Sequence, residues 1–250
     1  MVSEFSDEFL GALGGWQRGW NEDKSRRQQV TVKLIEAISQ NTLPLEAVKE
    51  PPFCYRKRFL IPFNSQNGGD LWPLFWDGEI IEGVASWTTD CDFAKNLFKR
   101  DLRPNSFAAI FRRMPSKTEV VLNIPELWKI AEFRERVDQY VLARGENFEA
   151  LDRFKASQSE IILNAPLTLD NVFSLCEKVP DHETICTLLR NENIDISGGE
   201  DEVWSRMTAT ELYPTNNYWL EQVNSQKVLD KVLDLFKKRH DSLMLTYKLK

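Results

Sequence analysis

The amino-acid sequence predicts an α+β fold, with helices near both ends of the chain and β-strands between them. Near both ends, apolar residues recur every three or four positions, which is the spacing of an amphipathic helix. In the middle, short apolar and aromatic runs are separated by turn-forming residues, as expected of strands. We therefore divide the chain into N-terminal helices (1–50), a strand-rich core (51–166) and a helical extension (167–250).

Two helices are predicted before residue 40. In residues 3–20 the aromatic and apolar side chains have helical spacing, although each of four glycines weakens a helix by up to about 1 kcal/mol. These glycines do not form the G-x-G-x-x-G fingerprint and no strand precedes them, so a Rossmann site is not predicted here. Residues 22–39 form a clearer amphipathic helix. Its apolar side consists of Val30, Leu34, Ile35 and Ile38.

The middle of the chain predicts strands separated by loops and helices. The expected strands are, in chain order, 53–61, 84–88, 107–111, 119–124 and 160–163. A helix is expected over 126–142 and a loop over 145–159. The helix-like segments of the C-terminal third are 168–178, 181–192 and 217–240.

Residues 83–98 predict a strand, a turn and a helix in succession. Ser86 and Thr88 alternate with apolar residues, so both hydroxyls leave the same face of the strand just before the helix begins. Thr89 or Asp90 is expected to cap the helix, and Asp92 completes a capping box after Thr89.

The strand predicted at 53–61 carries two arginines, Arg56 and Arg58, on one face. A guanidinium that faces a cleft can donate two parallel hydrogen bonds to a phosphate, which an ammonium does less directionally. The other interpretation is an edge strand that positive charge protects against aggregation.

The string Ala-Ser-Trp-Thr-Thr-Asp, followed by a helix with Ala and Phe, resembles the central Ser-x-Thr motif of the R-S-E group of ADP-ribosyltransferases. That family also has an Arg on an earlier strand and a Glu at the head of a later strand. Arg56 and Glu160 occur in this order. The resemblance covers about residues 53–166 and implies a split β-sandwich core, with the other helices as additions.

The resemblance implies that NAD is the co-substrate and that Glu160, Arg56 and Ser86 form the catalytic set. Glu160 would stabilise the positive charge that develops on the ribose, as carboxylates do in glycosidases. Arg56 would bind the phosphates, and Arg58 is the alternative; we prefer Arg56 because Tyr-Arg matches the family pattern. Ser86 would hold the pocket, with Trp87 and Thr88 beside it.

Nicotinamide already carries a positive charge and leaves without a general acid, so neither a histidine nor a metal ion is expected in this site. Trp72 and Trp76 are candidate walls for an NAD ring, although burial in the core or contact with a partner is the favoured interpretation.

The acceptor is expected to be a macromolecule, with RNA favoured over protein. The resemblance places Gln158, two residues before Glu160, and Phe154 in the loop that recognises the acceptor; in the family, Gln at this position goes with amide or base acceptors. Arg112 and Arg113 belong to a basic stretch over residues 95–117, which favours phosphate contacts. The opposing observation is the acidic pI of about 5.2.

Composition limits the other classes of function. The chain has 250 residues, a net charge of -6 and four scattered cysteines, so a zinc site or disulfide framework is not expected. It has neither a Sec-type signal sequence nor an apolar run long enough to cross a membrane, and a cytoplasmic protein is expected. We expect an intracellular toxin or phage-defence effector, with an antitoxin or immunity protein as its partner. The alternatives are an inactive relative that serves as an interaction module, and a transferase that modifies protein.

Overall fold

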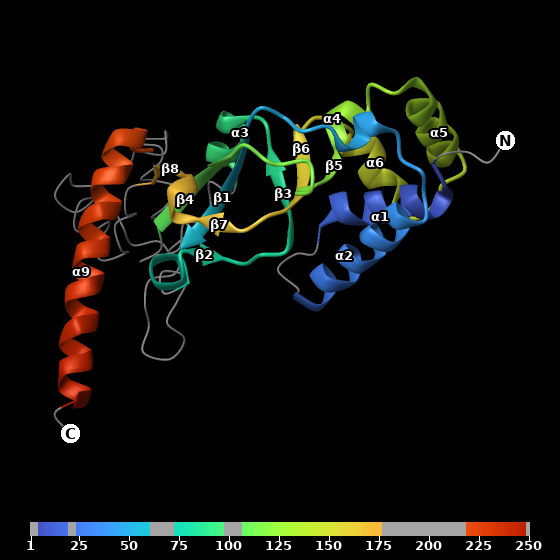
Figure 1. Ribbon diagram of the computed structural model, residues 1–250. Helices are drawn as coiled ribbons and strands as arrows, with labels where there is room; N and C mark the ends of the chain where they lie inside the picture. The colour runs from blue at the N-terminus through green and yellow to red at the C-terminus, as the bar shows by residue number, and fades with distance from the viewer. Residues whose placement is uncertain (1–4, 20–23, 61–72, 98–106, 177–218, 249–250) are drawn as a thin grey trace, which may run out of the picture. The chain divides into compact units, whose positions relative to one another are not determined.

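The chain forms two units, and each is built from stretches that are distant in sequence. The computed structural model describes residues 5–19, 24–60, 73–97, 107–176 and 219–248 (Figure 1). The first unit consists of Met1–Cys54, Glu82–Cys91 and Met114–Ala165. The second unit consists of Tyr55–Ile81, Asp92–Arg113 and Pro166–Lys250.

The first unit carries three antiparallel strands and several helices. Its strands are β3 (Val84–Thr88), β5 (Val120–Asn123) and β6 (Glu160–Asn164), in the order β5-β6-β3. Its helical elements are α1 (Asp7–Arg18), α2 (Lys24–Ser39), the 3-10 turn η1 (Leu45–Val48), α4 (Ile124–Leu127), α5 (Ala131–Leu142) and α6 (Phe148–Phe154). In Figure 1, α1, α2, α5 and α6 gather beside β5 and β6. Strand β6, which begins with Glu160, is hydrogen-bonded on both sides within this unit.

Helix α1 begins and ends at residues whose chemistry suits those positions. The Ser6 Oγ accepts a hydrogen bond from the Phe9 backbone N–H at 3.1 Å, which satisfies one donor of the first turn. Asp7 and Glu8 place negative charge at the positive end of the helix dipole. Gly19 ends the helix with a φ of +76°, a conformation that glycine adopts without strain.

The glycines of α1 allow this helix to pack directly on the start of α6. A Cβ on Gly14 would lie 2.7 Å from the Asn147 carbonyl oxygen, a distance at which backbone would have to move. A Cβ on Gly15 would meet only the Asn147 side-chain Nδ2, at 3.2 Å. The same Nδ2 donates to the Gly11 carbonyl at 3.2 Å. The glycines that lower the helix propensity of α1 therefore also allow this helix to lie close to the Asn147 backbone.

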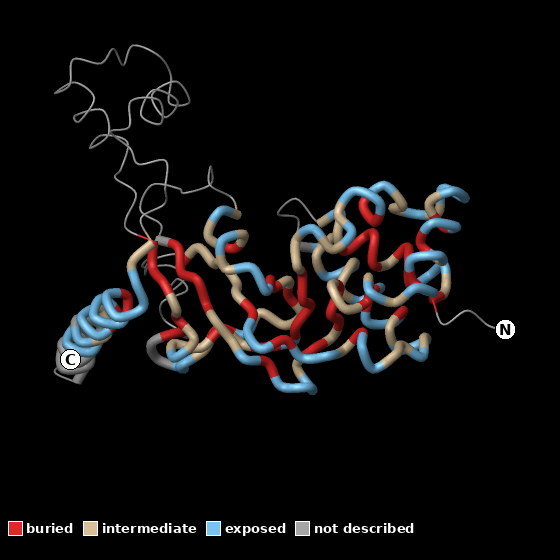
Figure 2. Tube along the Cα trace, turned by 90° about the horizontal axis from the view of Figure 1, so that it is seen from above, coloured by how far each residue is buried: buried red, intermediate tan, exposed pale blue. Residues whose placement is uncertain are grey.

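Aromatic and aliphatic side chains from the helices and strands form the core of the first unit. Figure 2 shows where the chain is buried. Its largest members include Phe5, Phe9, Leu10, Leu13, Trp16, Leu34, Leu122, Phe133 and Leu151. Full burial of such a side chain stabilises the fold by about 1.5–3 kcal/mol. Trp16 is 2% exposed, and it also reaches the candidate site described below.

The second unit contains a separate set of strands and the long C-terminal helix. Apart from its first residue, β1 (Cys54–Leu60) belongs here with β4 (Phe107–Arg113) and β8 (Val172–Leu175), in the order β1-β4-β8. Strands β2 (Glu79–Ile80) and β7 (Leu167–Thr168) form an antiparallel pair. The other elements are the π-helical turn η2 (Pro73–Asp77), α3 (Cys91–Asn96), the 3-10 turn η3 (Leu169–Asn171) and α9 (Gln222–Lys248).

Among the described residues, the first turns of helix α9 contact β8. The Ser225 Oγ accepts a hydrogen bond from the Leu175 backbone N–H at 3.0 Å, and Leu229 is buried one turn later. Most of the other side chains described on α9 are exposed (Figure 2).

The observed α+β class agrees with the sequence-based prediction. The strands expected over 53–61, 84–88, 107–111, 119–124 and 160–163 are present as β1, β3, β4, β5 and β6. The helices expected near the N-terminus and over 217–240 are present as α1, α2 and α9. Within α2, Leu34 is buried as predicted, whereas Ile35 is 38% exposed because it lies beyond the face that packs on the core.

Three expected elements differ from the structure. Residues 168–178 were predicted to be helical, but the described part forms β7, η3 and β8 because Val172 and Ser174 pair with β4. The helix expected over 126–142 is interrupted before Ala131, since Ile130 has an extended backbone with ψ 122°. The loop expected over 145–159 contains α6. The helix expected over 181–192 lies outside the described residues.

Among the described helices, none combines the length and the apolar character that a membrane crossing requires.

The contact between α1 and α6 gives a matched test of stability. Gly14→Ala should lower the free energy of unfolding by about 1–3 kcal/mol, because overpacking against backbone outweighs the better helix propensity of alanine. Gly15→Ala, which meets only a movable side chain, should change it by less than about 1 kcal/mol. Urea unfolding followed by circular dichroism measures both variants, and equal values for the two would contradict the close approach at Gly14.

Candidate active site

Strands β3 and β6 bring the predicted serine and glutamate together within the first unit. In their antiparallel ladder Ser86 pairs with Ile162, and Thr88 pairs with Glu160. Paired residues of a ladder point to the same side, and residues two apart on a strand share a face. Ser86, Thr88 and Glu160 therefore share one face of the sheet, as the alternation of the sequence predicted for the two hydroxyls.

The Glu160 carboxylate is buried and receives hydrogen bonds from two different elements. The Ser86 Oγ donates to Glu160 Oε1 at 2.5 Å, and the Trp16 Nε1 of α1 donates to the same oxygen at 2.8 Å. The glutamate is only 6% exposed. Burial disfavours a charged carboxylate, whereas donated hydrogen bonds favour the charged form, so the two donors offset part of the loss of solvation.

The loop between α6 and β6 is tied to the end of β3 through its backbone. The Thr88 Oγ1 donates to the Gln158 carbonyl at 2.8 Å, and the Thr89 N–H donates to the Ser159 carbonyl at 3.0 Å. Ser159 and Lys155 have positive φ values of 47° and 45°. These left-handed conformations let the loop turn sharply just before Glu160.

Helix α1 also holds the beginning of this loop. The Gln17 side chain donates from Nε2 to the Lys155 carbonyl at 3.1 Å. Because Trp16 and Gln17 are adjacent, one turn of α1 contacts both the glutamate and the segment that leads to it. In the sequence, Trp16 is one of the aromatic residues of the helix predicted within residues 3–20, and no local pattern indicates that it or Gln17 contacts the site.

Two other predicted site residues also belong to the first unit. Phe154 is the last residue of α6 and is half-buried, with the Arg153 guanidinium 5.3 Å from its ring centroid. Trp87 lies on the opposite face of β3 from Ser86, paired with Ile161, and is 2% exposed. The structure therefore does not bring Trp87 to the face that carries Glu160.

The predicted arginines lie on β1, in the second unit. Arg56 and Arg58 are half-buried and share one face of the strand. The other face makes local contacts: Tyr55 packs edge-on against Phe173, and the Lys57 Nζ donates to the Leu97 carbonyl at 2.6 Å. The alternation expected from the sequence is thus present in β1.

Arg112 and Arg113 lie within β4, so the strand is two residues longer than predicted. The Arg112 guanidinium lies 4.5 Å from the centroid of the Phe173 ring. Arg113 donates from Nη1 to the Asn171 Oδ1 at 2.9 Å. Other members of the basic stretch, Lys99, Arg100 and Arg103, lie outside the described residues, as do Trp72 and the side chain of Trp76.

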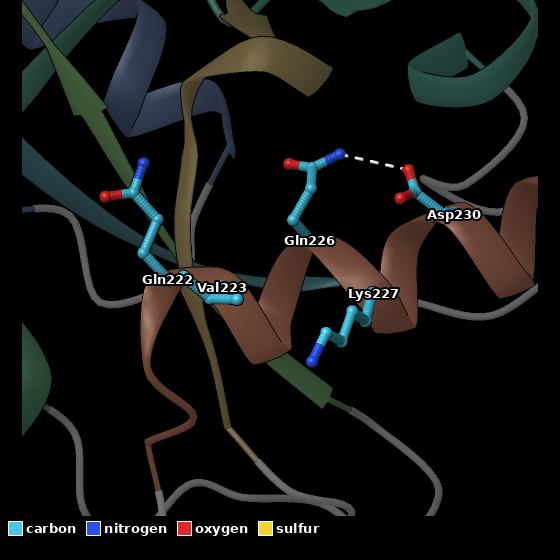
Figure 3. A pocket seen from close by; sticks show the side chains of 5 residues that line it. All are labelled: Gln222, Val223, Gln226, Lys227 and Asp230. Atoms are coloured by element: carbon cyan, nitrogen blue, oxygen red, sulfur yellow. Dashed lines mark hydrogen bonds between the residues drawn. The ribbon is translucent and has the colours of Figure 1, made fainter.

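Two further features of the described residues bear on where a catalytic or metal site could lie. A shallow depression on α9 is lined by Gln222, Val223, Gln226, Lys227 and Asp230 (Figure 3). Its polar groups come from one exposed helix and include the hydrogen bond between Gln226 and Asp230, so it offers no convergent catalytic pair. Among the described residues, no group of three or more His, Cys, Asp and Glu side chains is placed to hold a metal ion.

Comparisons of this chain with protein-family models, with curated proteins and with solved structures found no match.

Thr88 connects β3 to the loop that precedes Glu160. Its buried hydroxyl donates to the Gln158 carbonyl and accepts from the Asp90 N–H at 3.0 Å. Thr88→Val keeps the shape and removes both bonds, so the free energy of unfolding should fall by about 1–3 kcal/mol. Thr88→Ser keeps the hydroxyl and serves as the control in chemical denaturation. A valine variant no less stable than the serine variant would contradict this role.

Proposed function

We propose that this protein is an NAD-dependent mono-ADP-ribosyltransferase, a glycosyltransferase that cleaves NAD and transfers ADP-ribose to a macromolecule. The supporting observation is the hydrogen bond from Ser86 to the buried Glu160, beside Thr88 in the β3 and β6 ladder. The resemblance to the R-S-E group implies this pairing of a Ser-x-Thr strand with a glutamate at the head of a later strand. The proposal includes the split β-sandwich core that the same resemblance implies.

In the proposed reaction, the bond between the ribose C1′ and the nicotinamide nitrogen breaks, and its electron pair stays with the nitrogen. Nicotinamide leaves as a neutral molecule, while positive charge develops on C1′ and the ring oxygen. A nucleophile of the acceptor then attacks C1′ and loses its proton. A fixed carboxylate beside the ribose stabilises this oxocarbenium-like state, as in glycoside hydrolysis.

Each residue of the site has one role in this proposal. Glu160 stabilises the ribose in the transition state, and Ser86 fixes the carboxylate by donating to Oε1. Arg56 binds the NAD phosphates, with Arg58 on the same strand face as the alternative. Thr88 holds the loop that carries Gln158. Trp87 is left out because its ring is buried on the other face of β3.

We further propose that the protein acts inside cells as a toxin or phage-defence effector, with an antitoxin or immunity protein as its partner. This part of the proposal rests on the resemblance alone.

The second candidate is an inactive relative that serves as an interaction module. The observation that favours it is the burial of Glu160 under Trp16, since a carboxylate tied to two elements also has a structural use. Nicotinamide release separates the candidates, because an inactive module would not consume NAD at all.

Replacing the carboxylate tests the proposed function directly. Glu160→Gln should keep the fold and the affinity for NAD near wild type while slowing nicotinamide release roughly a thousandfold, because the lost charge acts mainly in the transition state. Glu149→Gln, the same change at an exposed position of α6, should have no effect. Chromatography of nicotinamide measures turnover, and wild-type release by Glu160→Gln would contradict the assignment.

The acceptor in this proposal is nucleic acid, with RNA favoured over protein. A Gln158 amide both donates and accepts hydrogen bonds, which suits the edge of a base, and Phe154 is close in sequence. Arg112 and Arg113 add positive charge on β4, in the second unit. Label confined to protein would instead indicate a protein-modifying transferase.

Labelled NAD identifies the acceptor class. We expect label on RNA, an about tenfold loss of labelling between 50 and 200 mM salt, and a similar loss in the Arg112→Ala/Arg113→Ala variant, while NAD hydrolysis persists. Asn171→Ala is the control because it removes the Arg113 acceptor but keeps both charges. Equal losses in the control would show that the arginines act through the local structure, and label found only in protein would overturn the RNA assignment.

A further inference from the structure

We infer that Trp16 is a positioning residue for Glu160, and that α1 is therefore part of the catalytic apparatus as well as of the core. This inference rests on the proposed function. It goes beyond the triad that the resemblance implies, because it assigns a role to a residue outside the segment the resemblance covers. The observation is the 2.8 Å hydrogen bond from Trp16 Nε1 to Glu160 Oε1.

This hydrogen bond distinguishes Trp16 from three other tryptophans of the described residues. The indole nitrogens of Trp87, Trp128 and Trp219 are also buried, and none of them donates to a described residue. An indole N–H in this fold therefore does not require a partner in order to be buried. Trp16 therefore donates to a carboxylate because α1 places its indole beside Glu160, and not because every buried indole N–H must be paired.

Trp16 is well suited to fix the direction of the carboxylate. It is 2% exposed and belongs to the core cluster, so its ring has little freedom to move. Ser86 donates to the same oxygen from β3, which means that Oε1 is held from a helix and from a strand at once. A charge stabilises a transition state best when its orientation is set before the reaction.

The Trp16 ring belongs to the hydrophobic core cluster and its indole N–H is bound to Glu160, so the proposal gives Trp16 no direct contact with substrate. Its effect must therefore pass through Glu160. This distinguishes it from an aromatic wall of an NAD pocket, whose removal would weaken binding. The expected signature is a lower kcat with an almost unchanged KM for NAD.

The test compares the same substitution at two tryptophans of the first unit. Trp16→Phe removes the donor and should lower kcat roughly ten- to hundredfold, with the KM for NAD within about twofold of wild type. Trp128→Phe is the matched control, because Trp128 packs on Phe133 in the same core and its indole N–H donates to no described residue. Wild-type kcat in Trp16→Phe, or equal losses in both variants, would overturn the inference.

A second variant and a second readout keep the test decisive. If Trp16→Phe does not fold, β-(3-benzothienyl)alanine at position 16 keeps the ring shape and lacks the N–H; a kcat equal to wild type would overturn the inference. If the protein releases no nicotinamide, the proposed function fails on its own. A double-mutant cycle of Trp16→Phe with Glu160→Ala then tests the contact. Coupling of roughly three- to tenfold in the folding equilibrium constant would support it, and no coupling would overturn it.

Discussion

The first unit depends on how a carboxylate is accommodated in its interior. Glu160 is 6% exposed, and a buried charge without donors would be strongly destabilising. The donors come from Ser86 on β3 and Trp16 on α1, so the carboxylate joins the sheet to the helical layer. The register of the β3–β6 ladder fixes the contact between Ser86 and Glu160. The contact between Trp16 and Glu160 is accompanied by the close approach of α1 to α6, which Gly14 permits.

In the proposed function the same arrangement would serve both stability and chemistry, and the two uses are compatible. A structural tie needs only an acceptor, which a glutamine would also supply, whereas an oxocarbenium-like state needs negative charge. The site lies where β3 ends, and the residues that follow, Thr89 and Asp90, are exposed. Catalytic groups often occur where a titratable side chain is buried and held by specific partners, so we propose an enzyme in preference to an interaction module.

The sequence predicted the parts of this site that local patterns control. Alternation over 84–88 and the run from Glu160 predict β3 and β6, and the resemblance to the R-S-E group implied that Ser86 and Glu160 meet. Trp16 was not predicted as a partner because it lies 144 residues from Glu160, and no periodicity specifies such a contact. Helix α6 was not predicted because it has only 7 residues and turn-forming residues lie on both sides of it. The local sequence of residues 172–175 predicts a helix, because no pattern in it indicates that these residues pair with β4.

The loop before Glu160 is held by its backbone, and this bears on how the proposed enzyme would set specificity and cleavage. Its three ties, from Thr88, Thr89 and Gln17, all go to backbone carbonyls. Thr88 in particular bonds the Gln158 carbonyl and not its amide, so the loop conformation does not depend on which side chain stands at position 158. In the proposed function, recognition of the acceptor could therefore change at Gln158 while the backbone that leads into Glu160 stays fixed, and specificity and cleavage would depend on neighbouring but separable groups.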